Sequence, residues 1–318
     1  MKAQLLGTTL LAVLTGALPA ADFQLLNLVM PDAKVLAGVN VERAKGTLFG
    51  QYVLTQMQSG HPEMQNLTAL TGFDPTRDVR ETLFASTGAP QSGLALALGN
   101  FDIGKITAAA NLKGAVSEAY HGVAILEDPK QTHGVAFLDK ATVAAGDIAS
   151  VKGAIDRQKN PQQPLSSDIS VKITQLGNSQ DAWVLCTVPP SSLAPPAKDA
   201  QARQIPPVVQ TVQSASGGVT FGNNVVFSGE AQTDTQANAS ALGDVVKLLI
   251  NLAQMNAGQN PQAAALAQSV QVNPNGNVLT VSLSLPEDQF QQLARFGKNS
   301  SETGQGRHRT PRPNSERK

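Results

Sequence analysis

The sequence is poor in cysteine, which limits both its cross-links and its chemistry. Cys186 is the only cysteine among 318 residues, so an intramolecular disulfide cannot form. It lies in the apolar run 182–188 with no cation beside it, which favours a small buried hydrophobic residue over a reactive thiol. A secreted eukaryotic protein of this size usually carries several disulfides, so the sequence favours a bacterial protein of the periplasm or the extracellular space.

Aromatic and charged residues are also scarce. They make up 4% and 15% of the chain, whereas apolar residues reach 41%. This balance predicts a core of Ala, Val and Leu and a surface rich in Gln, Asn, Ser and Thr, as is common in exported proteins. The length is sufficient for one large domain or for two ordinary ones.

The N-terminal apolar segment is too short for a membrane span. Residues 5–18 follow Lys2 and precede the small residues Pro19, Ala20 and Ala21. A helix needs roughly 20 apolar residues to cross a bilayer. We therefore predict a secretory signal peptide over 1–20, cleaved near Ala20, with no transmembrane span in the mature protein. A retained membrane anchor is the alternative, and a lipoprotein is excluded because no cysteine follows the segment.

Charge is zero overall but uneven along the chain. The segment 297–318 contains six basic and two acidic residues, whereas residues 21–296 carry a net charge of −5. The segment has almost no apolar side chains to bury, so we predict a disordered basic tail. Attraction to an anionic envelope surface or to nucleic acid is the alternative. No aromatic residues are interleaved to stack on bases, so no nucleic-acid partner is expected.

The stretch 31–57 predicts a strand that passes into a helix. Val35, Ala37, Val39 and Val41 alternate with Lys34, Leu36, Gly38, Asn40 and Glu42, which predicts that the wholly apolar face of the strand contacts a core. A four-residue period then aligns the apolar residues of a helix. Glycine disfavours a helix interior, and Gly46 therefore predicts a late start near Thr47.

The order of predicted elements repeats along the chain. Residues 80–158 and 217–296 both give a hairpin, a helix, two or more strands and a helix. The polar, proline-bearing segment 159–164 predicts a boundary. The predicted fold is therefore α+β, with two similar units over 21–160 and 161–296, each an antiparallel sheet with helices packed on one face. A final helix is expected over 286–296, and the segment 169–176 is ambiguous between helix and strand.

One loop approaches a phosphate-binding motif. Residues 99–106, GNFDIGKI, have the glycine and lysine spacing of that motif and lie between a predicted strand and a predicted helix. However, Ile106 replaces the hydroxyl residue that would hold magnesium, and Asp102 would repel phosphate. We therefore expect no nucleotide cofactor, and substitution of Lys105 tests this.

Other reactive residues form no recognisable set. His121 and His133 lie on neighbouring predicted strands, but no third ligand has metal spacing, so no metal site is expected. Ser216 precedes two glycines and is interpreted as a turn residue, and Asp74 and Asp78 as parts of a surface ion-pair loop. No catalytic residue, cofactor-binding residue or metal ligand is assigned from the sequence.

Several structural motifs resemble a group of secreted bacterial proteins of unknown function. They are the signal segment, Pro31-Asp32-Ala33 before a strand ending at Gly38, the Phe49-Gly50-Gln51-Tyr52 helix, and Gly72-Phe73-Asp74-Pro75 followed by Asp78. The resemblance covers most of the mature chain. It implies export and two related α+β halves, and it transfers no catalytic residues.

These observations favour an exported bacterial protein with a non-catalytic binding or structural role in the cell envelope. The motivation is the signal segment together with the lack of any reactive set, and the favoured partner is another envelope protein. The alternative is a secreted hydrolase whose active-site residues are dispersed in sequence.

Overall fold

The described part of the chain contains twelve β-strands, ten α-helices and two short 3-10 turns. The computed structural model describes residues 23–59, 62–89, 91–161, 165–193, 207–255 and 261–289. The strands are β1 (Val35–Asn40), β2 (Val79–Ser86), β3 (Leu94–Gly99), β4 (Val116–Tyr120), β5 (Val123–Glu127), β6 (His133–Phe137), β7 (Thr142–Asp147), β8 (Ala182–Cys186), β9 (Val212–Thr220), β10 (Asn224–Thr233), β11 (Val270–Asn275) and β12 (Val278–Pro286). The helices are α1 (Phe23–Leu26), α2 (Val41–Ala44), α3 (Leu48–Ser59), α4 (Pro62–Thr71), α5 (Pro75–Asp78), α6 (Ile103–Leu112), α7 (Ile148–Lys159), α8 (Ser167–Ser179), α9 (Gln236–Met255) and α10 (Pro261–Gln268), with 3-10 turns η1 (Pro190–Leu193) and η2 (Pro207–Thr211).

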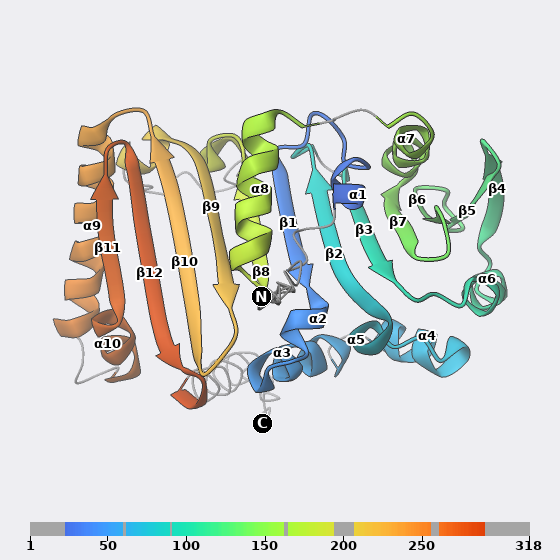
Figure 1. Cartoon of the computed structure of the whole chain (residues 1–318), viewed down its shortest axis with the longest axis horizontal. Coiled ribbons are helices and arrows are strands. Elements are labelled where there is room, and N and C mark those ends of the chain that lie inside the picture. Colours follow the sequence, from blue (N-terminus) through green and yellow to red (C-terminus); the bar gives the residue numbers. More distant parts are fainter. Residues whose placement is uncertain are drawn as a thin grey trace, which may run out of the picture.

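All twelve strands join one antiparallel sheet, which confirms the α+β class. Their order is β11-β12-β10-β9-β8-β1-β2-β3-β7-β6-β5-β4. Figure 1 shows α1, α7 and α8 in front of this sheet and α9 at its left end. The pairing of β1 with both β2 and β8 makes the sheet continuous across the predicted boundary at 159–164.

The face of β1 that enters the core is the opposite of the predicted one. Leu36 is fully buried, and Gly38 is buried beside Trp183 of β8, whereas Val35, Ala37 and Val39 are only half-buried. The prediction that Val35, Ala37 and Val39 face the core is therefore wrong. The alternation itself was predicted correctly. The core-facing side was missed because Gly38, which has no side chain, lies on it, and the indole of Trp183 occupies the space that a side chain at position 38 would fill.

The main core lies between the sheet and the helices α1, α7 and α8. A row of directly paired residues runs across seven strands and faces this core: Ile125, Ala136, Ala144, Leu96, Leu83, Gly38 and Trp183. The helix α8 adds Ile173 and Leu176. Residues from both predicted units therefore share one core.

The opposite face of the sheet is covered at the β11 end by α9. Gly243 of this helix lies against Leu279 of β12 and Val272 of β11, where a Cβ would come within 3.3 Å of the Leu279 side chain. Together with Val212 and Leu242, these residues form a second, smaller core. Thr235 begins the helix, since its hydroxyl accepts a hydrogen bond from the Asn238 amide at 3.2 Å.

Several local predictions have definite outcomes. The late start of the helix after β1 is confirmed at Leu48, and Phe49 is buried there against Phe221, with ring centroids 5.1 Å apart. The ambiguous segment 169–176 is helical, within α8, and the strand β4 was not predicted. The predicted signal segment 1–20 and basic tail 297–318 lie outside the described residues, as does most of the helix expected over 286–296.

Within the described ranges, none of the helices combines the length and the apolar character needed to cross a bilayer.

Candidate ligand-binding site

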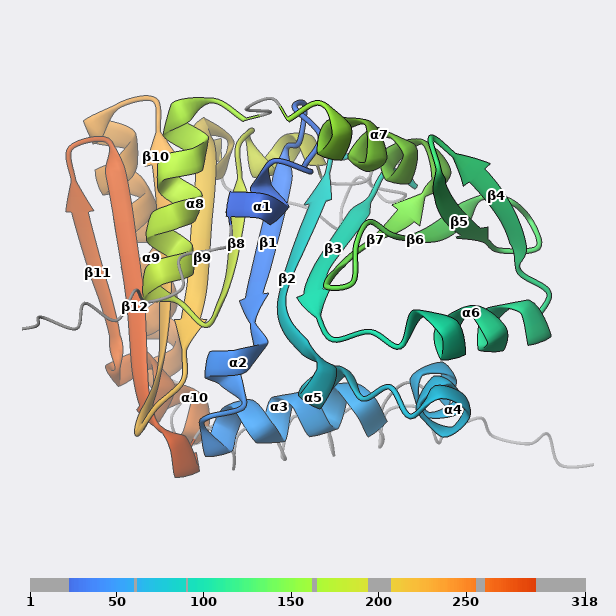
Figure 2. The same cartoon turned by 45° about the vertical axis from the view of Figure 1, so that its right-hand side comes forward.

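An apolar groove lies under the β4 end of the sheet. Figure 2 shows the strands β7, β6, β5 and β4 curling over α6 and α4, with α7 on their other side. The groove has a volume of about 680 Å³, which is within the range of small-molecule sites. Its apolar lining residues are Leu67, Leu70, Ile106, Ala109, Ala110, Ala115, Leu126, Pro129, Val135 and Ala145.

The strands contribute to the groove because they are apolar on both faces. Ile125 of β5 faces the main core, and the adjacent Leu126 faces the groove beside Val135 and Ala145. A strand with two apolar faces needs cover on both sides. The main core covers one face, and α6 covers the other with Ala109 and its neighbours.

The helix α6 is held at its first turn by Asp102. A carboxylate oxygen of Asp102 accepts a hydrogen bond from the Lys105 amide at 3.0 Å, and the other oxygen lies 3.1 Å from the Lys105 ammonium. The hydrogen bonds from Lys105 lower the pKa of Asp102. This cap fixes where α6 begins and so sets its apolar residues opposite the strands.

A few polar residues border the groove. Lys113 ends α6 and forms no ion pair with the described part of the chain. Asp128 accepts hydrogen bonds from the amides of Thr132 and His133, at 2.7 and 3.1 Å, which lower the pKa of its carboxyl. Glu127 and His133 also line the groove. Because Asp128 is engaged within its own loop and Glu127 hydrogen-bonds to Glu118, Lys113 is the group best suited to a ligand's anionic end.

A charged cluster occupies the other face of β5, below α7. Lys152 bonds both carboxylate oxygens of Glu118 at 2.9 Å. Glu127, with 5% of its surface exposed, hydrogen-bonds to Glu118, and that bond together with burial raises the pKa of Glu127. The bonds from Lys152 and Glu127 lower the pKa of Glu118. The pair resembles an acid and a base with separated pKa values, but both carboxylate oxygens of Glu118 are already bonded to Lys152.

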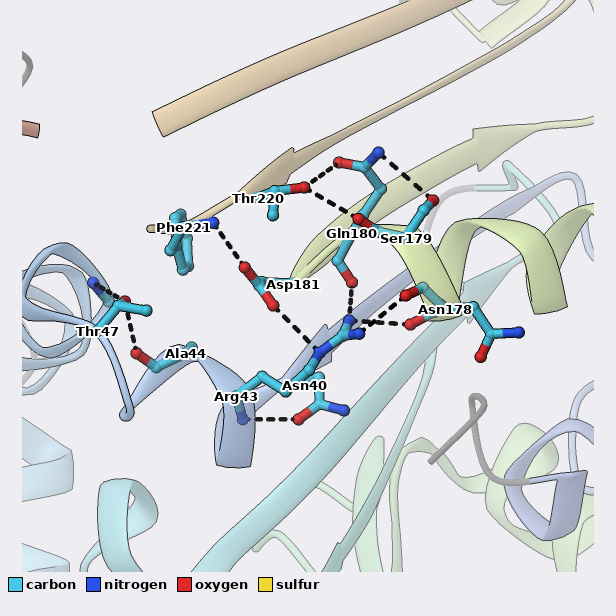
Figure 3. A network of polar contacts seen from close by, with 12 residues as sticks. Asn40, Arg43, Ala44, Thr47, Asn178, Ser179, Gln180, Asp181, Thr220 and Phe221 are labelled. Atoms are coloured by element: carbon cyan, nitrogen blue, oxygen red, sulfur yellow. Dashed lines mark hydrogen bonds and ion pairs between the residues drawn. The ribbon is translucent and has the colours of Figure 1, made fainter. Parts of the chain in front are cut away.

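A second polar network joins the middle of the sheet to α8 (Figure 3). The Arg43 guanidinium donates to the carbonyls of Gly177, Asn178 and Gln180 at the end of α8. Its Nε lies 3.1 Å from Asp181, whose other carboxylate oxygen accepts the amide of Phe221 at 2.6 Å. The cation meets the negative end of a helix, so this network is structural.

The loop that approaches a phosphate-binding motif does not form a phosphate site. Asp102 already occupies the amides at the start of α6. A cavity of about 470 Å³ lies beside it, but Lys105 is paired with Asp102, and Arg77 is paired with Asp78 at 2.7 Å. Both cations are therefore engaged by carboxylates.

His121 and His133, assigned to neighbouring strands from the sequence, lie in separate environments. His121 lies 3.1 Å from Asp156 and stacks on Tyr120, whereas the His133 ring contacts the hydroxyl of Thr132. Across the residues that the structure describes, no group of three or more His, Cys, Asp or Glu side chains could hold a metal ion.

The other residues considered in the sequence analysis belong to strands and a helix cap. Ser216 lies inside β9, not in a turn, because Gly217 and Gly218 permit close approach of neighbouring strand atoms there. Cys186 is half-buried in β8, and burial raises its pKa. Asp74 caps α5, and the side chain of Arg77 hydrogen-bonds to Asp78 and lowers the pKa of that carboxyl.

Sequence reasoning did not find the groove. Its lining comes from two helices and three strands that are distant in sequence, so no local motif marks it. The signal that was present is the run 123–126, which is apolar at every position and indicates a strand covered on both faces.

The comparisons with known proteins show the fold alone. No protein-family model matches the sequence, and no curated protein matches it. Crystal form III of TP0453 is similar with a TM-score of 0.55 at 9% identity, covering 83% of this chain and 95% of that one. Crystal forms IV and I give TM-scores of 0.53 and 0.54 at 10% identity, each covering 85% of this chain and 95% of the other.

Proposed function

We propose that this chain is an exported, non-catalytic binding protein of the bacterial envelope that holds an apolar small molecule in the groove between α6, α4 and the strands β5 to β7. The observation that carries the proposal is the groove itself, with its volume of about 680 Å³ and its mainly aliphatic lining. The N-terminal segment 1–20 supports export, as a signal peptide. A partner in the envelope that delivers or receives the ligand belongs to the same proposal.

A titration with an apolar fluorescent probe tests this function. Ala110 lines the groove, so Ala110→Trp should fill it and abolish saturable binding. Ala108 lies on the same helix and is exposed away from the groove, which makes Ala108→Trp the matched control. Equal binding by both variants, or no saturable binding by the wild type, would contradict the proposal.

The alternative, a secreted hydrolase, has one specific observation in its favour. Glu118 and Glu127 are neighbouring carboxyl groups whose pKa values are shifted in opposite directions. A panel of peptidase, esterase and glycosidase substrates distinguishes the two functions. Turnover by the wild type that is lost in Glu118→Gln would favour the hydrolase and overturn the non-catalytic proposal.

We also propose that the chain contains two similar α+β units joined edge to edge. In support, the β2–β3 hairpin precedes α6 and the β9–β10 hairpin precedes α9, and both helices contact the same face of the sheet. Superposition of β2, β3 and α6 on β9, β10 and α9 tests this. Opposite handedness of the two hairpin-to-helix connections would contradict it.

A further inference from the structure

We infer that the ligand is a single long, unbranched acyl chain with an anionic head group, and that its tail leaves the groove and extends onto the open face of the sheet at β3. This inference rests on the proposed function and names the ligand class of the same groove. It depends on how the groove continues beyond α6.

The groove-facing residues are part of one row across the sheet. Directly paired residues extend from the groove toward the centre, and all of them share a face: Leu126, Val135, Ala145, Ala95, Phe84, Ala37 and Val184. The first three line the groove. The row therefore extends the apolar floor of the groove onto β3, β2, β1 and β8.

The continuation of the row is apolar and open. Phe84 and Val184 have 44% and 46% of their surfaces exposed, and Ala95 is exposed between Phe84 and the groove. Beyond Val184 the row passes Gly217 and Gly229 and then reaches Val281, which packs with the second core under α9. The open stretch thus lies between α6 at one end and α9 at the other.

The shape of the stretch suits a narrow ligand. The small side chains of Ala37, Ala95 and Ala145 leave a shallow surface along the row. The Phe84 ring lies over Gly93, 3.4 Å from where a Cβ at that position would be, so the ring does not cover Ala95. None of the seven residues of the row is charged or polar. A flexible hydrocarbon chain fits this narrow apolar floor.

The length of the row also fits a long chain. With strands about 4.8 Å apart, the distance from Leu126 to Phe84 is about 19 Å, and to Val184 about 29 Å. A bilayer core of roughly 30 Å holds two acyl chains end to end, so one chain spans about 15 Å. A long chain that starts at Leu126 therefore reaches about as far as Ala95 on β3, three strands or about 14 Å away, while a short one stays inside the groove. Lys113 at the groove supplies the charge for a carboxylate or phosphate head group.

The experiment measures displacement of an apolar probe by saturated fatty acids of increasing length, from octanoate to hexadecanoate, below their aggregation concentrations. Ala95→Trp should block the open stretch, and Ala119→Trp, on the exposed edge strand β4, is the matched control. We expect the wild type and Ala119→Trp to bind hexadecanoate at least ten-fold more tightly than decanoate. In Ala95→Trp this preference should disappear while the affinity for decanoate stays unchanged.

The outcomes separate the inference from the function on which it rests. If Ala95→Trp keeps the full preference for hexadecanoate, the chain does not extend onto β3, and the inference fails while groove binding stands. If no fatty acid of any length displaces the probe from the wild type, both fail. If Lys113→Ala changes the affinity for decanoate by less than two-fold, the anionic head group is wrong.

Discussion

The Nε atom of Arg43 lies 3.1 Å from the carboxylate of Asp181, although the two residues are far apart in sequence. Arg43 follows β1, and Asp181 precedes β8. The amide of Asn40 donates to the Asp181 carbonyl at 2.8 Å, so backbone and side chains join the two halves at the same point. The relationship explains why the two predicted units form one sheet.

Removal of the Arg43 side chain should destabilise the protein strongly. Arg43→Ala leaves Asp181 buried without its cation, and the end of α8 without three carbonyl contacts. We expect a loss of about 3 kcal/mol in the free energy of unfolding, measured with urea. Arg77→Ala removes an exposed pair and is the control, with little effect expected on the midpoint. Equal losses of unfolding free energy in Arg43→Ala and Arg77→Ala would show that the Arg43 network stabilises the protein no more than the Arg77–Asp78 pair does.

The close approach of Gly38 to Trp183 predicts a specific intolerance. A Cβ at position 38 would lie 2.5 Å from the indole ring, so Gly38→Ala should force the ring to move and cost about 1 to 3 kcal/mol. Trp183 is the only tryptophan, so its fluorescence during urea unfolding reports both effects. Gly104→Ala in α6 meets only ordinary contacts and is the control. Unchanged fluorescence and stability in Gly38→Ala would refute the packing described.

Phe49 should behave as a core residue. It has 3% of its surface exposed and contacts the ring of Phe221 edge-on. Phe49→Ala should therefore cost about 3 to 5 kcal/mol, measured by chemical denaturation. A loss below about 1 kcal/mol would instead indicate an exposed aromatic binding surface.

The carboxyl pair below α7 predicts a pH-dependent stability. Because the folded state raises the pKa of Glu127, the stabilising effect of its protonated form is complete below the unfolded pKa of about 4.3 and is lost as the pH rises through the folded pKa. Glu127→Gln keeps a neutral hydrogen-bond donor. It should raise the melting temperature above that of the wild type at pH 8, with a smaller difference at pH 4.

Glu118 gives the opposite pH trend and serves as the internal control. Its pKa is lowered in the folded state, so its contribution is present above the unfolded pKa and is lost as the pH falls through the folded pKa. Glu118→Gln should therefore lower the melting temperature more at pH 8 than at pH 4. If both variants shift the melting temperature equally at the two pH values, the hydrogen bond between Glu118 and Glu127 does not form as described.

Local sequence determines an element where a single interaction decides the conformation. The hairpin around Gly222-Asn223-Asn224 forms because those residues suit a tight turn, and α7 starts after Asp147, whose carboxylate accepts the Ser150 amide at 2.9 Å. The face of β1 was wrong because its side-chain pattern alone could not show that Trp183 fills the space above Gly38. Trp183 lies more than a hundred residues from Gly38 in the sequence.

The groove, too, could not be predicted from local sequence patterns. Each of its walls can be predicted as an amphipathic helix or an apolar strand, but their juxtaposition depends on the sheet order, in which β7 pairs with β3. Sequence spacing does not give that order.

Binding of an apolar carboxylate to the groove is the most direct test of the account. Isothermal titration calorimetry with dodecanoate at two temperatures should show one saturable site in the wild type and in Ala108→Trp, with a negative heat-capacity change from burial of the chain. The same titration should give no saturable heat in Ala110→Trp when that variant is folded by circular dichroism. Binding to a folded Ala110→Trp with unchanged affinity would contradict the assignment of the groove as the ligand site.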